Sequence, residues 1–225
     1  MAIPVDIQGV LLDYDGVIAR TMEINLDAWR WSLGHFDSHL SAVEYFLLEG
    51  APPRDVAAQF LPPSFRDDPS SISRAVQLKE ARFLELAPSL RYYRGARMLV
   101  RLAVKLGLKI ALITGASRFR LQSSNKPGFL RRFDAIVTAE DVARGKPDPE
   151  AFLLGANRLG LRPRDCLVVE NAPLGISAAK SAGMRCLAIT STLNALELSE
   201  ADVIFDSVEV LFYEWCKQNV DSKAA

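Results

Sequence analysis

VLLDYDGV, residues Val10 to Val17, is the stretch of this chain on which the fold assignment depends. It ends a mostly apolar run that begins at Val5, and it carries two aspartates, Asp13 and Asp15, one residue apart. A short apolar run that stops at a polar, glycine-containing cluster is typical of a buried strand ending in a turn. The carboxyl ends of strands in a parallel α/β sheet border the crevice where ligands bind. Two carboxylates there can hold a divalent cation and act beside it, although taken alone they are as readily explained as caps of a turn.

Composition limits the class of protein. The chain has 225 residues, of which 49% are apolar, and its 27 basic and 27 acidic side chains give a formal net charge of zero. This balance argues against general binding to nucleic acid or an anionic membrane and favours a small-molecule partner. No apolar run approaches transmembrane length, no signal peptide is expected, and the three cysteines show no CxxC spacing. We therefore expect a cytoplasmic globular protein that acts as a monomer or homodimer.

Residues 20–90 have a helical pattern throughout. Apolar residues recur at helical spacing over 22–33, 41–49, 54–61 and 69–87, with breaks at the glycine- and proline-containing segments EGAPP (49–53) and LPPSFRDDPSS (61–71). No convincing strand occurs in this region. We predict a helical cap domain over 20–90, inserted into a core domain formed by 1–17 and 95–225, with hinges near 17–20 and 89–95.

From residue 95 onward, expected strands and helices alternate. The expected strands are 109–113, 135–138, 166–170, 185–190 and 203–205, and the last expected helix is 208–216. Strands that alternate with helices imply right-handed βαβ units and a parallel sheet. The predicted fold class is therefore α/β, a doubly wound parallel sheet with an inserted helical cap.

Polar groups able to carry chemistry follow the ends of these expected strands. One crevice would collect Asp13, Asp15, Thr114, Gly115, Ala116, Lys146, Glu170 and Asn171. Asp13 suits a nucleophile, and Asp15 can bend over it as an acid and base. Thr114 and the two amides that follow it can hold oxyanions. Lys146 can neutralise developing negative charge, and oxygens of the 170–171 pair can hold a hard cation.

Four segments in this order, DYDGV, ITGAS, GKPDP and ENAPLGISAAKSAG, resemble the four motifs of the haloacid dehalogenase superfamily of phosphatases and phosphomutases. The resemblance covers nearly the whole chain, and the helical insertion is similar to that family's first cap type. It implies that Asp13 attacks phosphorus to form an aspartyl phosphate. It also implies that Asp15 protonates the leaving oxygen and then activates water. An acid at position 15 favours a phosphate ester, because the dehalogenases of the superfamily lack an acid there.

The resemblance also implies a binding role for the remaining motif residues. Thr114 and the amides of Gly115 and Ala116 would bind phosphate oxygens, while Lys146 would bridge the nucleophile and the phosphoryl group. Magnesium would be held by the Asp13 carboxylate, the Asp15 carbonyl and the pair Glu170 and Asn171. A carboxylate that attacks a phosphate dianion needs such cationic screening. The fourth motif usually ends in two acids, so Asn171 departs from the pattern, and we predict that it is still a direct ligand.

The expected cap resembles that of the β-phosphoglucomutase-like branch, through TMEINLDAWRW (21–31) and EGAPPRDV (49–56). That branch uses a cap histidine and a cap arginine for the sugar phosphate. Arg54 matches the arginine with a one-residue shift, and Asn25 stands where the histidine would be, which favours hydrolysis over mutase activity. Lys79 is the one lysine of the insertion, and its place in a late helix argues against a Schiff-base phosphonatase.

The predicted function is magnesium-dependent hydrolysis of a small phosphorylated metabolite. A β-phosphoglucomutase-type sugar phosphomutase is the first alternative. A ligand-binding protein that kept the fold and lost turnover is the second, and Asn171 is its only support.

Overall fold

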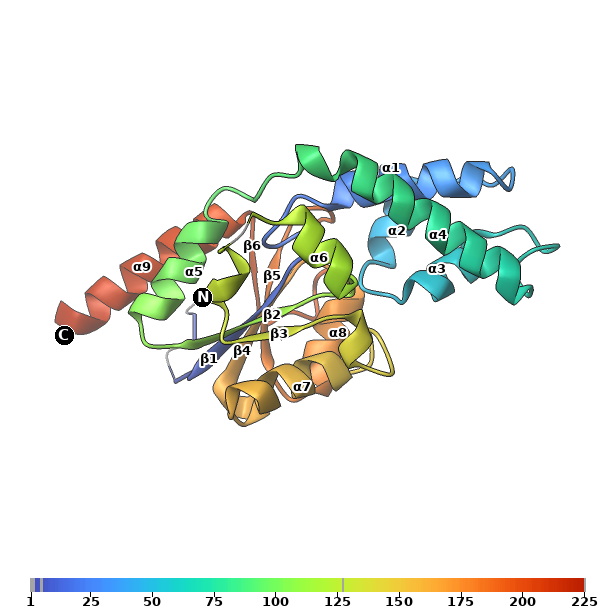
Figure 1. Ribbon diagram of the computed structural model, residues 1–225. Helices are drawn as coiled ribbons and strands as arrows, with labels where there is room; N and C mark the ends of the chain where they lie inside the picture. Colours follow the sequence, from blue (N-terminus) through green and yellow to red (C-terminus); the bar gives the residue numbers. More distant parts are fainter. Residues whose placement is uncertain (1–2, 5, 127, 225) are drawn as a thin grey trace.

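A six-stranded parallel sheet forms the centre of the computed structural model, which describes residues 3–4, 6–126 and 128–224 (Figure 1). Its strand order is β3-β2-β1-β4-β5-β6, and every neighbouring pair is parallel. The strands are β1 (Gly9–Asp13), β2 (Lys109–Ile113), β3 (Ala135–Val137), β4 (Cys166–Glu170), β5 (Arg185–Ile189) and β6 (Val203–Phe205). The predicted doubly wound α/β fold is confirmed.

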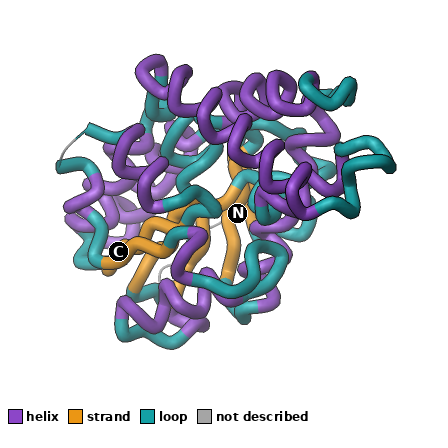
Figure 2. The backbone as a smooth tube through the Cα atoms, turned by 45° about the vertical axis from the view of Figure 1, so that its right-hand side comes forward, coloured by secondary structure: helices purple, strands orange, loops and turns teal. Residues whose placement is uncertain are grey.

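Helices cover both faces of this sheet, which explains why β1 is buried along its whole length. Val10 and Leu12 face one hydrophobic cluster, to which α5 (Ala96–Lys105), α6 (Arg118–Ser124) and α9 (Val208–Ala224) contribute. Leu11 points to the opposite cluster, formed with α7 (Glu150–Leu159) and α8 (Pro173–Ser181). Successive residues of a strand alternate between faces, so a strand covered on both sides must be apolar at every position. Figure 2 shows the strands in the interior, with helices on either side.

Four helices lie apart from the sheet and pack mainly on one another, and we call them the helical unit (Figure 1). They are α1 (Met22–Gly34), α2 (Ala42–Leu47), α3 (Pro53–Phe60) and α4 (Pro69–Leu86). Trp29 and Leu33 of α1 belong to a separate hydrophobic cluster that Val56 and Ala57 of α3 also join. The expected start of α4 is confirmed, because the Asp68 side chain caps the helix and Pro69 is its first residue.

Two linkers join the helical unit to the sheet, and they lie side by side. The Arg20 N–H donates to the Arg91 carbonyl at 2.8 Å, and the Tyr93 N–H donates to the Ile18 carbonyl at 3.0 Å. Both connections therefore leave the sheet at one place, close to the end of β1.

Two elements differ from their expected bounds by more than two residues. β1 begins at Gly9, whereas the apolar run begins at Val5, which lies outside the described residues. β2 and β4 start in register with Gly9, at Lys109 and Cys166, so an earlier residue has no strand beside it. α9 continues to Ala224, beyond the predicted end at residue 216. No helix in the described part of the chain is long and apolar enough to cross a membrane.

The order of the strands determines where a ligand can bind. β1 lies between β2 and β4, and the chain proceeds outward in one direction through β2 and β3 and in the other through β4, β5 and β6. Loops on the two sides of such a switch point diverge and leave a crevice at the carboxyl ends of the strands. Asp13 at the end of β1 and Glu170 at the end of β4 both border this crevice.

Substitution of Gly95 should test the packing of α5 against α9. Gly95 has a φ of +88°, and a Cβ there would lie 2.7 Å from the Glu209 Cα. Gly183 has a φ of +72°, but a Cβ would meet no described atom within 4 Å. Each Gly→Ala change should cost about 1–2 kcal/mol of backbone strain. We expect Gly95→Ala to lower the free energy of unfolding by a further ~1–3 kcal/mol, because α9 must move. Urea denaturation of both variants measures this difference, and equal losses would contradict it.

Candidate active site

An ammonium group bridges two buried acids at the mouth of the crevice. The Lys146 Nζ donates to Asp13 Oδ1 at 2.5 Å and also to Glu170 Oε1. All three side chains are at most 5% exposed. Burial raises the pKa of Asp13 well above its ordinary value; the Lys146 ammonium opposes this rise, and the carboxylates of Glu170 and Asp15 add to it. Burial alone would lower the pKa of Lys146, but Asp13 and Glu170 outweigh it and raise that pKa, so Lys146 stays charged.

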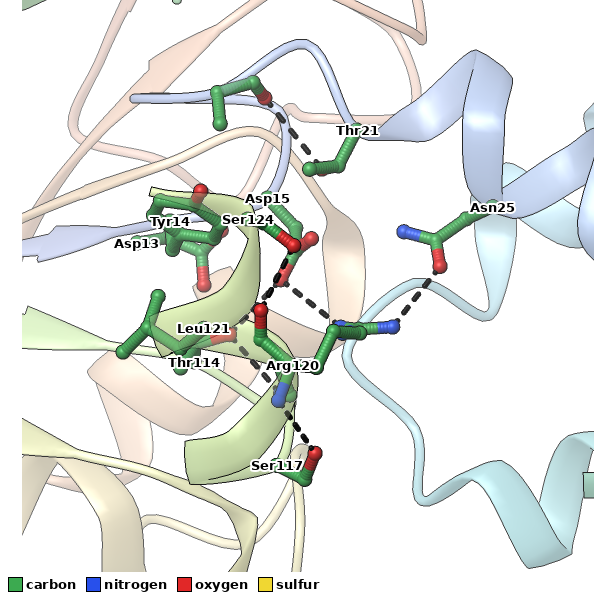
Figure 3. A network of polar contacts seen from close by, with 12 residues as sticks. Asp13, Tyr14, Asp15, Thr21, Asn25, Thr114, Ser117, Arg120, Leu121 and Ser124 are labelled. Atoms are coloured by element: carbon green, nitrogen blue, oxygen red, sulfur yellow. Dashed lines mark hydrogen bonds and ion pairs between the residues drawn. The ribbon is translucent and has the colours of Figure 1, made fainter. Parts of the chain in front are cut away.

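Asp15 lies in a polar environment of a different kind (Figure 3). Its Oδ2 accepts a hydrogen bond from Thr114 Oγ1 at 2.9 Å and lies 3.5 Å from the Arg120 Nη2. Burial would raise the pKa of Asp15, but the Arg120 guanidinium and hydroxyl hydrogen bonds hold it below its ordinary value. The Ala116 N–H donates to Thr114 Oγ1 at 3.0 Å, and Gly115 lines the cavity. The first two motifs are therefore joined directly.

Arg120 connects the sheet to the helical unit. Its side chain is 7% exposed, and its Nη1 donates to Asn25 Oδ1 at 3.1 Å and lies 3.5 Å from Glu80 Oε1. Figure 3 shows the guanidinium between Asp15 and Asn25. One cation thus contacts the expected acid–base residue, α1 and α4 at once.

Lys79 of α4 lines the same cavity, although in the sequence its place in a late helix argues only against a Schiff-base phosphonatase. It is 2% exposed, and its Nζ donates to Glu80 Oε1 at 2.8 Å. Burial lowers the pKa of Lys79 to about 8, and the charge of Arg120 acts in the same direction. Sequence spacing alone does not show that the long α4 helix turns this residue toward the end of β1.

The two predicted substrate residues are placed differently. Asn25 is 3% exposed and lines the cavity. Arg54 is exposed in the first turn of α3 and is not among the described residues that line the cavity. The structure therefore brings Asn25 to the other site residues and leaves Arg54 outside.

Glu49 is the site residue that the sequence did not single out. It follows α2 and is 6% exposed, and its Oε2 accepts a hydrogen bond from Asn171 Nδ2 at 2.7 Å. Burial raises the pKa of Glu49 well above its ordinary value, and the carboxylates of Asp13 and Glu170 raise it further. Its segment was assigned as a glycine–proline break, where no periodicity shows which side chain turns inward.

The donor chemistry of this site fits a hard divalent cation. Carboxylate and amide oxygens are the ligands that magnesium prefers. Three of the buried oxygens that have no hydrogen-bond partner among the described residues belong to this site: Asp15 Oδ1, Glu49 Oε1 and Asn171 Oδ1. Within that part of the chain, no group of three or more His, Cys, Asp and Glu side chains is arranged around a single metal position. Lys146 instead balances the two acids that it bridges.

Two glycines make room for the residues of the fourth motif. A Cβ on Gly175 would lie 1.9 Å from Glu170 Oε1, and a Cβ on Gly16 would lie 2.1 Å from Asn171 Nδ2. The Glu170 Oε2 is fixed further by the backbone N–H groups of Asn171 and Ala172, at 2.7 and 3.1 Å. Buried backbone contacts therefore fix the positions of Glu170 and Asn171.

The helical unit covers the site at the carboxyl ends of the strands. The cavity has a volume of about 50 Å³ and is lined by residues of both parts of the chain, including Asp13, Asp15, Lys146, Trp29 and Tyr45. That volume holds a few water molecules and is well below the roughly 300 Å³ of a usual ligand pocket. This arrangement is a closed one.

Comparison with known proteins agrees with this geometry. Residues 5–183 match the family model of the haloacid dehalogenase-like hydrolases. Hexitol phosphatase A of Escherichia coli (strain K12) is 28% identical over 90% of this chain and 92% of that protein. Fructose-1-phosphate phosphatase YqaB of the same organism is 33% identical over 78% of this chain and 93% of that protein.

A solved structure gives the same result for the fold. The putative β-phosphoglucomutase from Bacteroides vulgatus superposes with a TM-score of 0.82 at 28% identity, over 94% of this chain and 88% of that one. The resemblance inferred from the four motifs is confirmed, and the chain is an enzyme of the hydrolase class. It belongs to the haloacid dehalogenase-like hydrolase family.

Proposed function

We propose that this protein is a magnesium-dependent phosphatase that hydrolyses a small phosphorylated metabolite through an aspartyl phosphate on Asp13. The observation that carries the proposal is the pairing of two buried aspartates with different partners: Asp13 with Lys146, and Asp15 with Thr114 and Arg120. Two carboxylates in different environments can take two roles in one reaction. The two curated relatives, named as a hexitol phosphatase and a fructose-1-phosphate phosphatase, support a phosphorylated sugar or sugar alcohol as the substrate class.

The first step would be attack by an Asp13 oxygen on phosphorus. The new bond joins Asp13 to phosphorus, the bond from phosphorus to the leaving oxygen breaks, and Asp15 gives that oxygen its proton. Lys146 would neutralise part of the charge that gathers on the phosphoryl group. The lowered pKa of Asp15 leaves it ionised in the free site, and the incoming phosphate dianion favours its protonated form.

The second step would hydrolyse the aspartyl phosphate on Asp13. Asp15, now ionised, would take a proton from water as the water oxygen attacks phosphorus, which frees Asp13 and inorganic phosphate. Magnesium, when bound, would screen the repulsion between the Asp13 carboxylate and the phosphate. The residues that would hold it are Asp13, the Asp15 carbonyl, Glu170 and Asn171.

We propose that the helical unit acts as a cap over residues 20–90 and that the core comprises 1–17 and 95–225. A sugar phosphate does not fit a cavity of about 50 Å³, so substrate entry requires the unit to move away. The two adjacent linkers support a hinge at residues 17–20 and 89–95. In the closed state, Asn25, Lys79 and Arg120 would contact the part of the substrate beyond its phosphoryl group.

The phosphomutase alternative is kept because of the structural likeness to a putative β-phosphoglucomutase. Asn25 disfavours it, because an amide does not exchange protons near neutral pH as a histidine does. Conversion of a sugar 1-phosphate to the 6-phosphate without net phosphate release would identify a mutase. Turnover that depends on a metal would exclude a protein that only binds its ligand.

Loss of the nucleophile provides the primary test. Asp13→Asn should lower phosphate release from a panel of sugar and polyol phosphates by roughly a thousandfold or more, because an amide cannot form the covalent intermediate. Mass spectrometry of the rapidly quenched native protein should show one added phosphoryl group on the peptide that contains Asp13.

Asp27→Asn is the matched control, since Asp27 is exposed on α1 and should keep full activity. Treatment of the native protein with a chelator should abolish turnover, and magnesium should restore it. Undiminished release from the Asp13→Asn protein would rule out this mechanism.

Lys79 should make substrate binding depend on pH. With a pKa of about 8, its side chain is an ammonium at lower pH and loses its charge as the pH rises through that value. We therefore expect KM for a phosphate ester to increase above pH 8. Lys79→Gln should raise KM roughly tenfold at pH 7 and remove this increase. The exposed Lys105→Gln should leave the KM profile unchanged, and an unaltered profile in Lys79→Gln would show that Lys79 does not contact the substrate.

A further inference from the structure

Glu49 is a buried acid of the helical unit to which the proposed mechanism gives no task. Its Oε2 accepts from Asn171 Nδ2 at 2.7 Å, and its Oε1 has no hydrogen-bond partner in the described part of the chain. The neighbouring Gly50 has a φ of +88°, and a Cβ there would lie 2.8 Å from the Lys146 Cδ. The loop thus passes directly over the lysine that bridges Asp13 and Glu170.

Asn171, on the other side of this contact, is the neutral residue of the fourth motif. It is fully buried, its Oδ1 is unpartnered among the described residues, and its Nδ2 also lies 3.3 Å from Thr192 Oγ1. A carboxylate stands opposite it, on a different part of the chain. The site therefore contains a second acid beside Glu170, but that acid is on the helical unit instead of at position 171.

Two oxygens at the contact between Glu49 and Asn171 lack a hydrogen-bond donor, which indicates a cation site. A buried acceptor without a donor costs free energy, and an unpaired buried carboxylate costs more. Glu49 Oε1 and Asn171 Oδ1 are both without a partner among the described residues. The Lys146 ammonium, in the same cavity, already serves Asp13 and Glu170. A divalent ion would satisfy oxygens of this kind.

We propose that Glu49 supplies the carboxylate that position 171 lacks, so that the metal site is completed by the helical unit. The inference rests on the magnesium dependence proposed above. The cation would then be held by both parts of the chain and would bind most tightly in the closed state. Metal loading and closure over the substrate would be linked, because each would favour the other.

The test is metal affinity, measured by titrating the intact protein with Mg²⁺ in a calorimeter and with Mn²⁺ by electron paramagnetic resonance. Glu49→Gln keeps an oxygen that can accept from Asn171, and it removes only the charge. We expect it to raise Kd for both ions by about tenfold or more. Glu49→Gln combined with Asn171→Asp moves the charge to the core, and it should restore Kd to within about threefold of the native value. Glu44→Gln, on the exposed face of α2, is the matched control and should leave Kd unchanged.

A second measurement follows closure itself through amide hydrogen exchange of residues 48–51. Magnesium should slow exchange in the native protein and should not do so in Glu49→Gln. The double variant should bind magnesium without protecting this loop, because its acid is no longer on the helical unit. Glu49→Asp, which withdraws the charge by one methylene, should give an intermediate Kd and provides the comparison if Glu49→Gln fails to fold.

The outcomes separate this inference from the proposed function. Native affinity in Glu49→Gln, with the loop still protected by magnesium, would show that Glu49 only holds the two parts together by its hydrogen bond, and the inference would be wrong. Failure of the native protein itself to bind magnesium would overturn both the inference and the proposed metal dependence. Weak binding in Glu49→Gln that the double variant does not restore would also contradict the charge argument.

Discussion

The pairing of Lys146 with Asp13 and Glu170 is the interaction on which the rest of the site depends. Four acids, Asp13, Asp15, Glu49 and Glu170, are buried around one small cavity. A buried charge persists only when it is paired, so each of these acids needs a cation beside it to stay ionised. Lys146 serves two acids and Arg120 serves a third, whereas Glu49 faces an amide. Gly50 and Gly16 leave room for this arrangement, because a Cβ on Gly50 would meet Lys146 and a Cβ on Gly16 would meet Asn171.

The sequence was sufficient for the fold because the relevant signals are local. Continuous apolar runs such as KIALI (109–113) and CLVVE (166–170) are what a strand covered on both faces requires, and each forms a strand with the expected bounds. The ends of β1 and α9 were less accurate. The start of β1 depends on where β2 and β4 begin, and the end of α9 depends on packing against α5. Neither can be inferred from the residues of the segment itself.

The site was predictable only where its residues belong to motifs. Asp13, Asp15, Thr114, Lys146 and the 170–171 pair are brought together as expected because each follows a strand at one edge of the sheet. Glu49 and Lys79 reach the same cavity from the helical unit, whose docking onto the sheet is a matter of shape. Arg54 shows the converse, since a matching position in a motif did not place its side chain in the closed cavity. The spacing of residues in the sequence does not predict how the helical unit docks onto the sheet.

The central place of β1 also has a consequence for how the protein is made. β1 is synthesised before the other five strands of the sheet, yet its two neighbours are β2 and β4, which begin at Lys109 and Cys166. Until β4 has been synthesised, one edge of a mostly apolar strand has no partner, and exposed edges of this kind favour aggregation. The helical unit, synthesised immediately after β1 and holding its own hydrophobic cluster, can fold during that interval. A chain that ended soon after the helical unit would carry Asp13 and Asp15 at the end of a strand with no partner, and it would lack Thr114, Lys146, Glu170 and Asn171.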